Sequence, residues 1–386
     1  MATEKENYDA VFVGAGVVGL ASAWSCVRRG AAVCVLERDH PAAGATGVAA
    51  GMLAPVGEAS WGEESLLSLN RDSLDLWPRF AEALERDADL QVQFVPRGAL
   101  HVALDRDEAE DLRRRHELHR SLGLESEWLP ARECRALEPG LATAVRGGAH
   151  VPGEASVDPR RLTAALLSAL DRRAVPVHSG AEVVATEPLE SGWRVRTADG
   201  RSFGAHVVVL CAGSWSGRHD WVPEESRPPV RPVKGEILTL RGPAADPVCE
   251  RIVAGERVYM VPRADGRLIV GATMDERGFD LTVTAGGVHE LLREAYRLIP
   301  EIAELELLET GAGLRPGTPD NAPLIGWSAT EGLLIATGHH RNGVLQAPIT
   351  AESVAALLAK EKPRADLEPF SPRRFGRPAA TRAEVR

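Results

Sequence analysis

Residues 8–37 read YDAVFVGAGVVGLASAWSCVRRGAAVCVLE, and the segment changes from strand to helix character and back. Residues 8–13 are a short apolar run typical of a buried strand, and residues 20–29 carry apolar side chains at helical spacing until Gly30 ends the helix. A second apolar run, residues 32–36, is closed by Glu37. The segment predicts a strand–helix–strand unit around a Gly-x-Gly-x-x-Gly turn, as dinucleotide-binding folds require.

The glycines of this turn each have a separate expected role. Gly14 permits the tight turn, Gly16 lets the backbone approach a pyrophosphate, and Gly19 lets the helix pack on the strand. The phosphates would lie at the helix N-terminus, where unpaired N–H groups and the helix dipole favour anions. Glu37 can accept hydrogen bonds from ribose hydroxyls and disfavours a 2′-phosphate, so NADP is not expected. The motif alone does not choose between FAD and NAD, and a structural glycine-rich turn is the alternative.

Composition excludes several classes of protein. The chain has 386 residues, a net charge of −10 and 44% hydrophobic residues, which fits one large domain or two interleaved domains. It has no apolar stretch of about 18–20 residues, no signal-peptide pattern at its N-terminus and no basic patch interleaved with aromatic residues. We therefore expect neither a membrane nor a nucleic-acid partner. Five scattered cysteines without CxxC spacing predict reduced thiols in the cytoplasm rather than disulfides or a zinc site.

The rest of the chain predicts further helices and strands. Asp158 and Pro159 form a helix start signal, and Pro348 is acceptable only in the first turn of a helix. Two Ala-Asp-Gly turns, at 198–200 and 264–266, predict hairpins. The predicted helices are 65–87, 106–122, 159–172, 288–298 and about 344–360, and the predicted strands are 94–104, 193–197, 201–205, 207–210, 230–240, 258–261, 268–273 and 333–336.

Seven segments together resemble a known family. Residues 44–55 (GATGVAAGMLAP) are small residues with one hydroxyl, which suits close approach of a flat ring, although a flexible loop has the same composition. The other six segments are VVVLCAGSW at 207–215, RPVKGE at 231–236, YMVPR at 259–263, VGATM at 270–274, GLRPGTPD at 313–320 and GHHRNGV at 338–344. From about residue 8 to 360 the chain resembles the D-amino-acid oxidase superfamily of flavoproteins, and within it the glycine oxidases of thiamine biosynthesis.

The resemblance implies the architecture and the cofactor. It implies non-covalent FAD in a Rossmann-like α/β domain that is interleaved with a mixed, largely antiparallel substrate domain. We expect the FAD-binding domain at 1–85, 150–220 and 310–365, the substrate domain at 86–149 and 221–309, and a frayed tail at 366–386. The residues implied at FAD are Gly14, Gly16, Val17, Val18, Gly19, Glu37, Arg38, Thr46, Ala49, Ala50, Gly51, Met52, Val183, Val184, Ala212, Gly213, Trp215, Arg315, His340, Arg341, Asn342, Gly343, Val344 and Leu345.

By the same resemblance, Arg315 is the anchor for a substrate carboxylate. A guanidinium stays charged and donates two parallel hydrogen bonds, which fixes the orientation of a carboxylate. Tyr259 would donate its hydroxyl to the same group, and Met52 and Met274 would shape the apolar side of the pocket. The alternatives are a surface arginine, a core tyrosine and methionines that fill gaps in the core.

Two arginines of the predicted site are open to two interpretations, and a histidine pair precedes one of them. Arg341 is implied at the substrate or the flavin edge, with a structural ion pair as the alternative, and the helix after it would point its N-terminus at the flavin ring. His339 and His340 are adjacent and cannot share a face, so no metal site is expected. Arg257 departs from the family, which has a neutral or histidine residue there. It would lie on the Tyr259 side of a strand, as an anion contact or a solvated side chain.

The implied activity is oxidation of a C–N bond next to a carboxylate. Glycine is the leading substrate, and the products are an imine that hydrolyses to an oxo acid and ammonia or amine, with O2 reduced to H2O2. No dedicated base is expected, since binding alone positions Cα. The alternatives are an oxidase of a bulky N-substituted glycine in a natural-product pathway, and a dehydrogenase that passes electrons to a partner. A homo-oligomer is compatible with either.

Overall fold

The first strand–helix–strand unit forms as the sequence predicts. The computed structural model describes residues 7–59 and 61–375. Strand β1 (Asn7–Val13) and strand β2 (Val33–Leu36) pair in parallel, and helix α1 (Val17–Arg28) connects them. The glycine turn therefore lies at the carboxyl end of β1, where α/β folds bind ligands.

A sheet of eight strands grows around this unit. Its order is β17-β18-β11-β1-β2-β8, and β10 extends it as an antiparallel partner of β11, with β9 antiparallel to β10. The two predicted strands 201–205 and 207–210 are one continuous strand, because its first half pairs with β10 while its second half pairs with β1 and β18. The added strands are β8 (Val177–His178), β9 (Val183–Leu189), β10 (Gly192–Thr197), β11 (Ser202–Leu210), β17 (Leu324–Trp327) and β18 (Leu333–Thr337).

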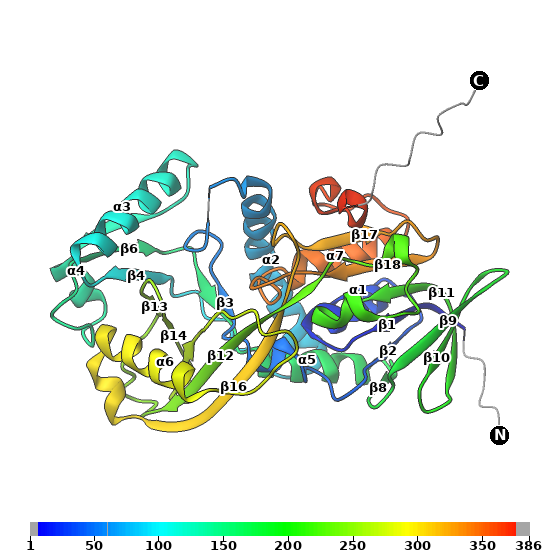
Figure 1. The fold of residues 1–386 in the computed structure, drawn as a ribbon, viewed down its shortest axis with the longest axis horizontal. Helices are drawn as coiled ribbons and strands as arrows, with labels where there is room; N and C mark the ends of the chain where they lie inside the picture. Colours follow the sequence, from blue (N-terminus) through cyan, green and yellow to red (C-terminus); the bar gives the residue numbers. More distant parts are fainter. Residues whose placement is uncertain (1–6, 60, 376–386) are drawn as a thin grey trace.

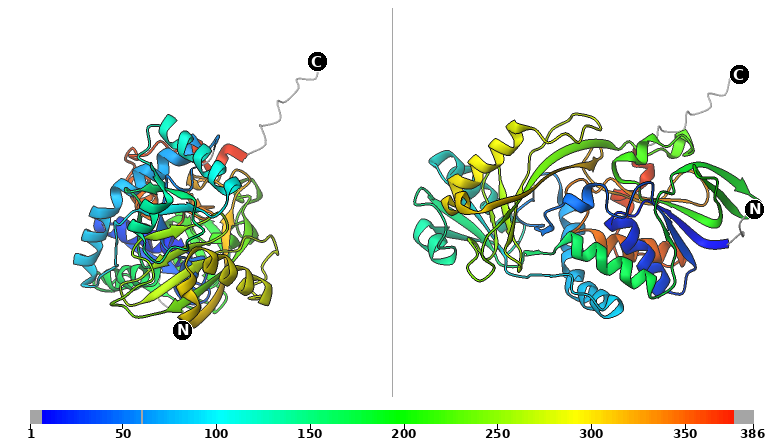
Figure 2. Two further views of the ribbon diagram at one scale, coloured as in Figure 1. Left: turned by 90° about the vertical axis from the view of Figure 1, so that its left-hand side faces the viewer. Right: turned by 90° about the horizontal axis from the view of Figure 1, so that it is seen from below.

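Four helices cover one face of this sheet (Figure 2). They are α1, α2 (Glu64–Ala88), α5 (Pro159–Asp171) and α7 (Ala347–Leu358), and they share one apolar core with Phe12 of β1. The Asp158 side chain accepts hydrogen bonds from the first-turn N–H groups of α5, which confirms the predicted start signal. Helix α7 begins at Ala347 rather than near 344, and Pro348 occupies its first turn, where a missing N–H costs nothing.

A second sheet lies beside the first and carries its own core (Figure 1). Its order is β16-β12-β15-β14-β13-β4-β6-β5, antiparallel except for the parallel pair β13–β4. The predicted strand 94–104 shortens to β4, with Val95 making only an isolated bridge to Ser156. The strands are β4 (Ala99–Ala103), β5 (Glu127–Pro130), β6 (Gly147–Val151), β12 (Arg231–Arg241), β13 (Ile252–Ala254), β14 (Tyr259–Pro262), β15 (Arg267–Gly271) and β16 (Glu306–Gly317).

Helices cover the outer parts of this second sheet. Helix α6 (Ala285–Leu298) packs on β12 and β15 through Leu291 and Leu298, while α3 (Arg106–Ser121) packs on β4 and β6 next to the short α4 (Ala131–Leu137). The mixed second sheet beside a parallel-cored first sheet confirms the predicted fold class. A two-stranded sheet, β3 (Met52–Leu53) with β7 (Ala155–Ser156), forms a third, smaller pairing.

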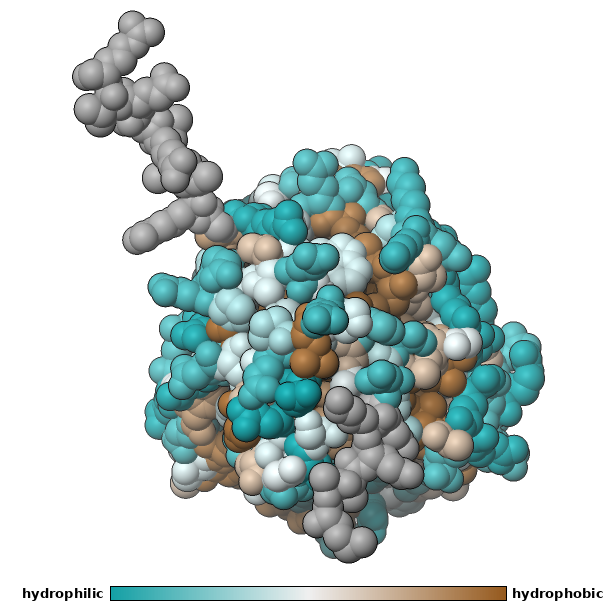
Figure 3. Space-filling model, turned by 90° about the vertical axis from the view of Figure 1, so that its right-hand side faces the viewer, coloured by the Kyte–Doolittle hydropathy of each residue, from teal (hydrophilic) through white to brown (hydrophobic). Residues whose placement is uncertain are grey.

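The long strands β12 and β16 run from the second sheet toward the first (Figure 1). Strand β16 crosses the expected domain boundary at residue 310, and β6 crosses the one at 149. The exact domain boundaries therefore stay predictions. The face on the right of Figure 1 is mainly hydrophilic, with apolar residues in small groups, as is usual for a folded protein surface (Figure 3).

The expectation of a frayed tail is wrong for residues 366–375, which are ordered against the rest of the protein. Phe370 is buried, with 3% of its surface exposed, and it packs with Leu76 and Ile325. Arg374 pairs with Asp320 at 2.8 Å, and Arg373 donates to the Ser328 carbonyl. Residues 376–386 of the tail lie outside the described residues. Among the helices described, none combines the length and the apolar character needed to cross a lipid bilayer.

Candidate active site

A cavity of about 570 Å³ extends from the first sheet to the second. Its walls include the carboxyl ends of β1, β2, β11 and β18, where Gly14, Glu37, Ala212 and His339 lie. The opposite wall comes from β12, β14 and β16 of the second sheet. One end of the cavity thus has the position of a dinucleotide site, and the other end opens onto the mixed sheet.

The glycine turn has the geometry of a phosphate cradle. Gly14 has a φ of +111°, and a Cβ there would lie 2.5 Å from the Cys211 carbonyl oxygen. Gly16 precedes α1 without any side-chain cap, while the Val17 N–H donates to the Thr46 hydroxyl at 3.1 Å. Uncapped N–H groups at a helix N-terminus suit an anion. Gly19 does not line the cavity, because it is pressed against the Gly14 carbonyl, which is its predicted packing role.

Glu37 is fixed at the end of β2 beside this cradle. Its two carboxylate oxygens accept from the Ala15 N–H at 2.8 Å and the Asp39 N–H at 3.0 Å. A carboxylate has about four acceptor positions, so it can still accept from ribose hydroxyls. Arg38 stacks over the Trp215 ring at 4.8 Å, and both line the cavity.

Most of the residues implied at the cofactor line this one cavity, but three do not. Besides Gly19, Val184 points outward with 51% of its surface exposed, because it alternates with the cavity-lining Val183 along β9. Leu345 is buried, and its carbonyl accepts from Ser73 and Trp77 of α2. The members that line the cavity are Gly14, Gly16, Val17, Val18, Glu37, Arg38, Thr46, Ala49, Ala50, Gly51, Met52, Val183, Ala212, Gly213, Trp215, Arg315, His340, Arg341, Asn342, Gly343 and Val344.

Arg315 and Tyr259 meet at the far end of the cavity. The Arg315 guanidinium donates to the Thr273 carbonyl at 3.1 Å, and both Arg315 and Tyr259 line this end of the cavity. Burial raises the pKa of Tyr259, and the Arg315 charge partly offsets this rise. The tyrosine therefore keeps its proton at neutral pH, and its hydroxyl can donate a hydrogen bond to an anion.

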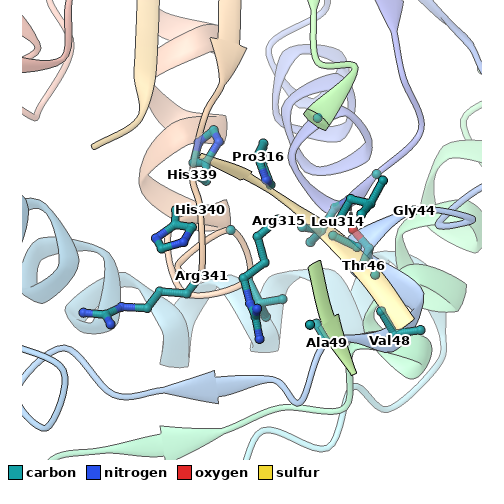
Figure 4. A pocket seen from close by; sticks show the side chains of 18 of the residues that line it. Gly44, Thr46, Val48, Ala49, Leu314, Arg315, Pro316, His339, His340 and Arg341 are labelled. Carbon is teal, nitrogen blue, oxygen red and sulfur yellow. Dashed lines mark hydrogen bonds between the residues drawn. The ribbon is translucent and has the colours of Figure 1, made fainter. Parts of the chain in front are cut away.

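Arg341 lies apart from Arg315, as Figure 4 shows, with its side chain turned away from the centre of the cavity. Its Nε is 3.1 Å from Glu58 Oε2, and its terminal nitrogen donates to the Glu58 carbonyl at 3.0 Å. Arg341 both lines the cavity and forms an ion pair with Glu58, so it has features of both interpretations. Glu58 was missed because a single glutamate in a loop gives no sequence signal.

The remaining candidates differ in how they face the cavity. Met52 packs with Ala50, Ile237 and Tyr259, whereas Met274 is 61% exposed and fills no core gap. Arg257 precedes β14, because that strand starts only at Tyr259, and it is exposed at the cavity.

The adjacent histidines have separate environments. His339 is buried, its Nε2 lies 3.0 Å from the Thr350 hydroxyl, and burial lowers its pKa to about 3. His340 lines the cavity, and burial together with Arg341 and Arg315 lowers its pKa to about 4. Within residues 7–59 and 61–375, no group of three or more His, Cys, Asp or Glu side chains is arranged to hold a metal ion.

Comparison with known proteins agrees with this geometry. The family model "FAD dependent oxidoreductase" (DAO) matches residues 9–357. The glycine oxidase of Geobacillus kaustophilus is 35% identical over 95% of this chain and 96% of its own, and the glycine oxidase of Pseudomonas aeruginosa is 32% identical over 94% and 98%. The crystal structure of the Geobacillus enzyme superposes with a TM-score of 0.89 over 96% of this chain and 99% of that chain. An iminodiacetate oxidase from Chelativorans sp. BNC1 is 28% identical, with a TM-score of 0.83 over 94% and 98%.

The cofactor of this family is FAD, and the residues present fit it. The uncapped start of α1, the cradle that a Cβ at Gly14 would fill and the fixed Glu37 carboxylate supply a pyrophosphate site and a ribose acceptor. With its matching family model, near full-length relatives and common fold, the chain belongs to the DAO family of FAD-dependent oxidoreductases.

Proposed function

We propose that the chain is an oxidase of the amine of glycine or a small glycine derivative. The observation that carries the proposal is the Arg315–Tyr259 pair at the far end of the FAD cavity. FAD, when bound, supplies the two-electron acceptor. A hydride leaves the substrate Cα, the Cα–N bond becomes C=N, and water converts this imine to glyoxylate and ammonia or amine. O2 takes up two electrons and two protons as H2O2. The glycine oxidase relatives support this assignment.

The side chains at the second sheet have the chemistry to orient such a substrate. Arg315 would bind the carboxylate through two parallel hydrogen bonds, and Tyr259 would donate a third. Met52 and Met274 would limit the space at Cα, and Arg341 would add positive charge at the same end. Together these contacts hold Cα in one orientation, which is how binding lowers the barrier to hydride transfer.

The cofactor contacts form the other part of the proposal. The pyrophosphate would lie at Gly14, Gly16 and the start of α1, and the ribose at Glu37. The segments 46–52, 212–215 and 340–344, which line the middle of the cavity, would surround the flavin.

Partners and location extend the same proposal. The substrate would be a small molecule with a carboxylate and an amine, and O2 would be the oxidant. The five cysteines, all free and buried, support a reducing cytoplasmic location. The resemblance to the glycine oxidases of thiamine biosynthesis supports a role for the oxidation in that pathway.

A panel of amines with coupled peroxide detection tests the proposed function. We expect glycine and sarcosine to have higher kcat/KM values than D-valine or D-phenylalanine, because one misfitting methylene already costs about 1–3 kcal/mol in a tight pocket. An N-substituted glycine such as iminodiacetate tests the wider substrate class. Faster oxidation of D-phenylalanine than of every glycine derivative would overturn the proposal.

A further inference from the structure

Four side chains form one ring cluster beside the ribose end of the cavity. The Arg38 guanidinium lies 4.8 Å from the centre of the Trp215 ring, and the Trp215 and Phe279 ring centroids are 5.5 Å apart. Arg218 completes the ring cluster, with its guanidinium 4.9 Å from the centre of the Phe279 ring. Arg38 and Trp215 line the cavity, and Arg38 directly follows the ribose acceptor Glu37. One side of the ring cluster is therefore a wall of the proposed FAD site.

The ring cluster connects segments that follow the two different sheets. Trp215 and Arg218 belong to the 3-10 helix Gly213–Arg218, which follows β11 of the first sheet, whereas Phe279 lies between β15 of the second sheet and α6. Phe279 is half-buried, although the two residues before it are exposed. The contact with Trp215 therefore shields an aromatic side chain at a turn that is otherwise open to solvent.

The backbone at Trp215 is held by the serines on either side of it. The Ser214 hydroxyl donates to the Leu314 carbonyl at 2.7 Å, and the Ser216 hydroxyl lies 2.8 Å from the Thr337 hydroxyl. Both serines are buried, so these hydrogen bonds are shielded from competition with water. The backbone at Trp215 is thus fixed, and the orientation of its ring depends on the groups packed against it.

A buried ion pair of β12 fastens the segment that carries Phe279. The side chains of Lys234 and Glu236 are buried, with 0% and 1% exposed, and their charged atoms are 3.1 Å apart. After Phe279, the Lys234 ammonium donates to the Thr282 carbonyl. Before Phe279, the Asp275 backbone exchanges hydrogen bonds with the Lys234 backbone at 2.8 and 3.0 Å. The segment is therefore fastened on both sides of Phe279, which keeps the ring at its place in the cluster.

We propose that Phe279 is a positioning residue for the cofactor, because it holds the Trp215 ring and, through that ring, Arg38 at the wall of the FAD site. Without the Phe279 ring, Trp215 would lose its partner on the side away from Arg38 and could turn out of the wall. A segment that follows the second sheet would thus help to retain the FAD bound at the first. This inference rests on the FAD contacts proposed above and does not depend on which amine is oxidised.

The test measures how fast the purified holoenzyme releases FAD on dilution, from the rise in free-flavin fluorescence. We expect release to be about tenfold faster in Phe279→Ala, the order expected for one aromatic pair with its cation–π contact. Phe279→Leu, which is apolar but has no ring, should release FAD about fivefold faster, because ring contacts stabilise beyond the buried area. Phe279→Tyr keeps the ring and should stay within about twofold of wild type.

The matched control is Phe375→Ala. Phe375 is an exposed ring with the Arg374 guanidinium 4.5 Å from its centre, but it does not line the cavity. FAD release from this variant should stay within about twofold of wild type. Release at the wild-type rate from Phe279→Ala or Phe279→Leu, or equal acceleration in Phe375→Ala, would overturn the inference. A wild-type protein that carries no FAD would instead overturn the proposed cofactor site.

Discussion

Two glycines make the substrate end of the cavity possible. A Cβ on Gly235 of β12 would overlap the Arg315 guanidinium, and one on Gly271 of β15 would lie 2.6 Å from the Tyr259 hydroxyl. Each functional side chain thus lies flat over a neighbouring strand that has no side chain there. Gly235 and Gly271 do nothing chemically, yet they determine where the guanidinium and the hydroxyl can lie.

Arg315→Ala should lower kcat/KM for glycine by roughly 30-fold to several thousand-fold, since truncating one side of a buried charge pair costs about 2–5 kcal/mol. Arg315→Lys should recover only part, because an ammonium cannot make two parallel hydrogen bonds. FAD content, read from absorbance, serves as the control and should stay normal. Near-normal kcat/KM with full FAD would move the carboxylate anchor to Arg341 or Arg257.

At the scale of elements, helix α5 connects the two sheets through one side chain. Asp158 caps α5 with its Oδ1, and its Oδ2 lies 2.6 Å from an Arg267 nitrogen at the start of β15. The carboxylate is buried, with 1% of the side chain exposed, and Arg263 lies 4.0 Å away. Burial alone would raise the pKa of Asp158, but Arg263 and Arg267 together hold it below its usual value.

Removing this carboxylate should destabilise the protein. Asp158→Ala should cost about 3–5 kcal/mol in the free energy of unfolding, because it removes the buried carboxylate beside Arg263 and leaves Arg267 paired with Asp265 alone. The matched control is Asp105→Ala at the exposed N-terminus of α3, which should cost only about 1 kcal/mol. Urea denaturation of both variants gives the comparison. Equal losses in the two variants would show that Asp158 acts only as a cap.

The same pair predicts a pH dependence. Because the folded-state pKa of Asp158 is depressed, its contribution is present above the unfolded value of about 3.9 and is lost as pH falls through the lower, folded value. The stability gap between wild type and Asp158→Ala should therefore narrow in acid.

For the whole molecule, the sequence predicted what depends on local signals. The β1–α1–β2 unit, the capped helix α5 and the hairpin of β14 and β15 all have turn or cap residues at their ends, and all are confirmed. The course of β11 was missed, because only its neighbours β10 and β18 show where a strand continues. Phe370 was placed in a frayed tail, since its burial depends on Leu76 and Ile325, which are distant in sequence.

The residues of the candidate site also differ in whether local sequence signals could identify them. Gly14, Gly16 and Glu37 are close in sequence and could be found from their spacing, whereas Arg315 and Tyr259 required the family resemblance. Glu58 required the structure, because its partner Arg341 meets it only in the folded chain. Val184 was wrongly expected at the cofactor because its neighbour Val183 lines the cavity. Adjacent residues on a strand face opposite sides, and Val184 faces outward.

If one cavity joins an FAD site to an amino-acid anchor, a bound substrate should reduce the flavin when O2 is absent. The purified protein should be yellow, with FAD that acid precipitation releases. Glycine or sarcosine added without O2 should bleach the flavin absorbance, and admitting O2 should restore the colour with one H2O2 for each substrate oxidised. A colourless protein that binds NAD, or a flavin that glycine and its N-substituted derivatives leave oxidised, would show that the cavity does not join these two sites.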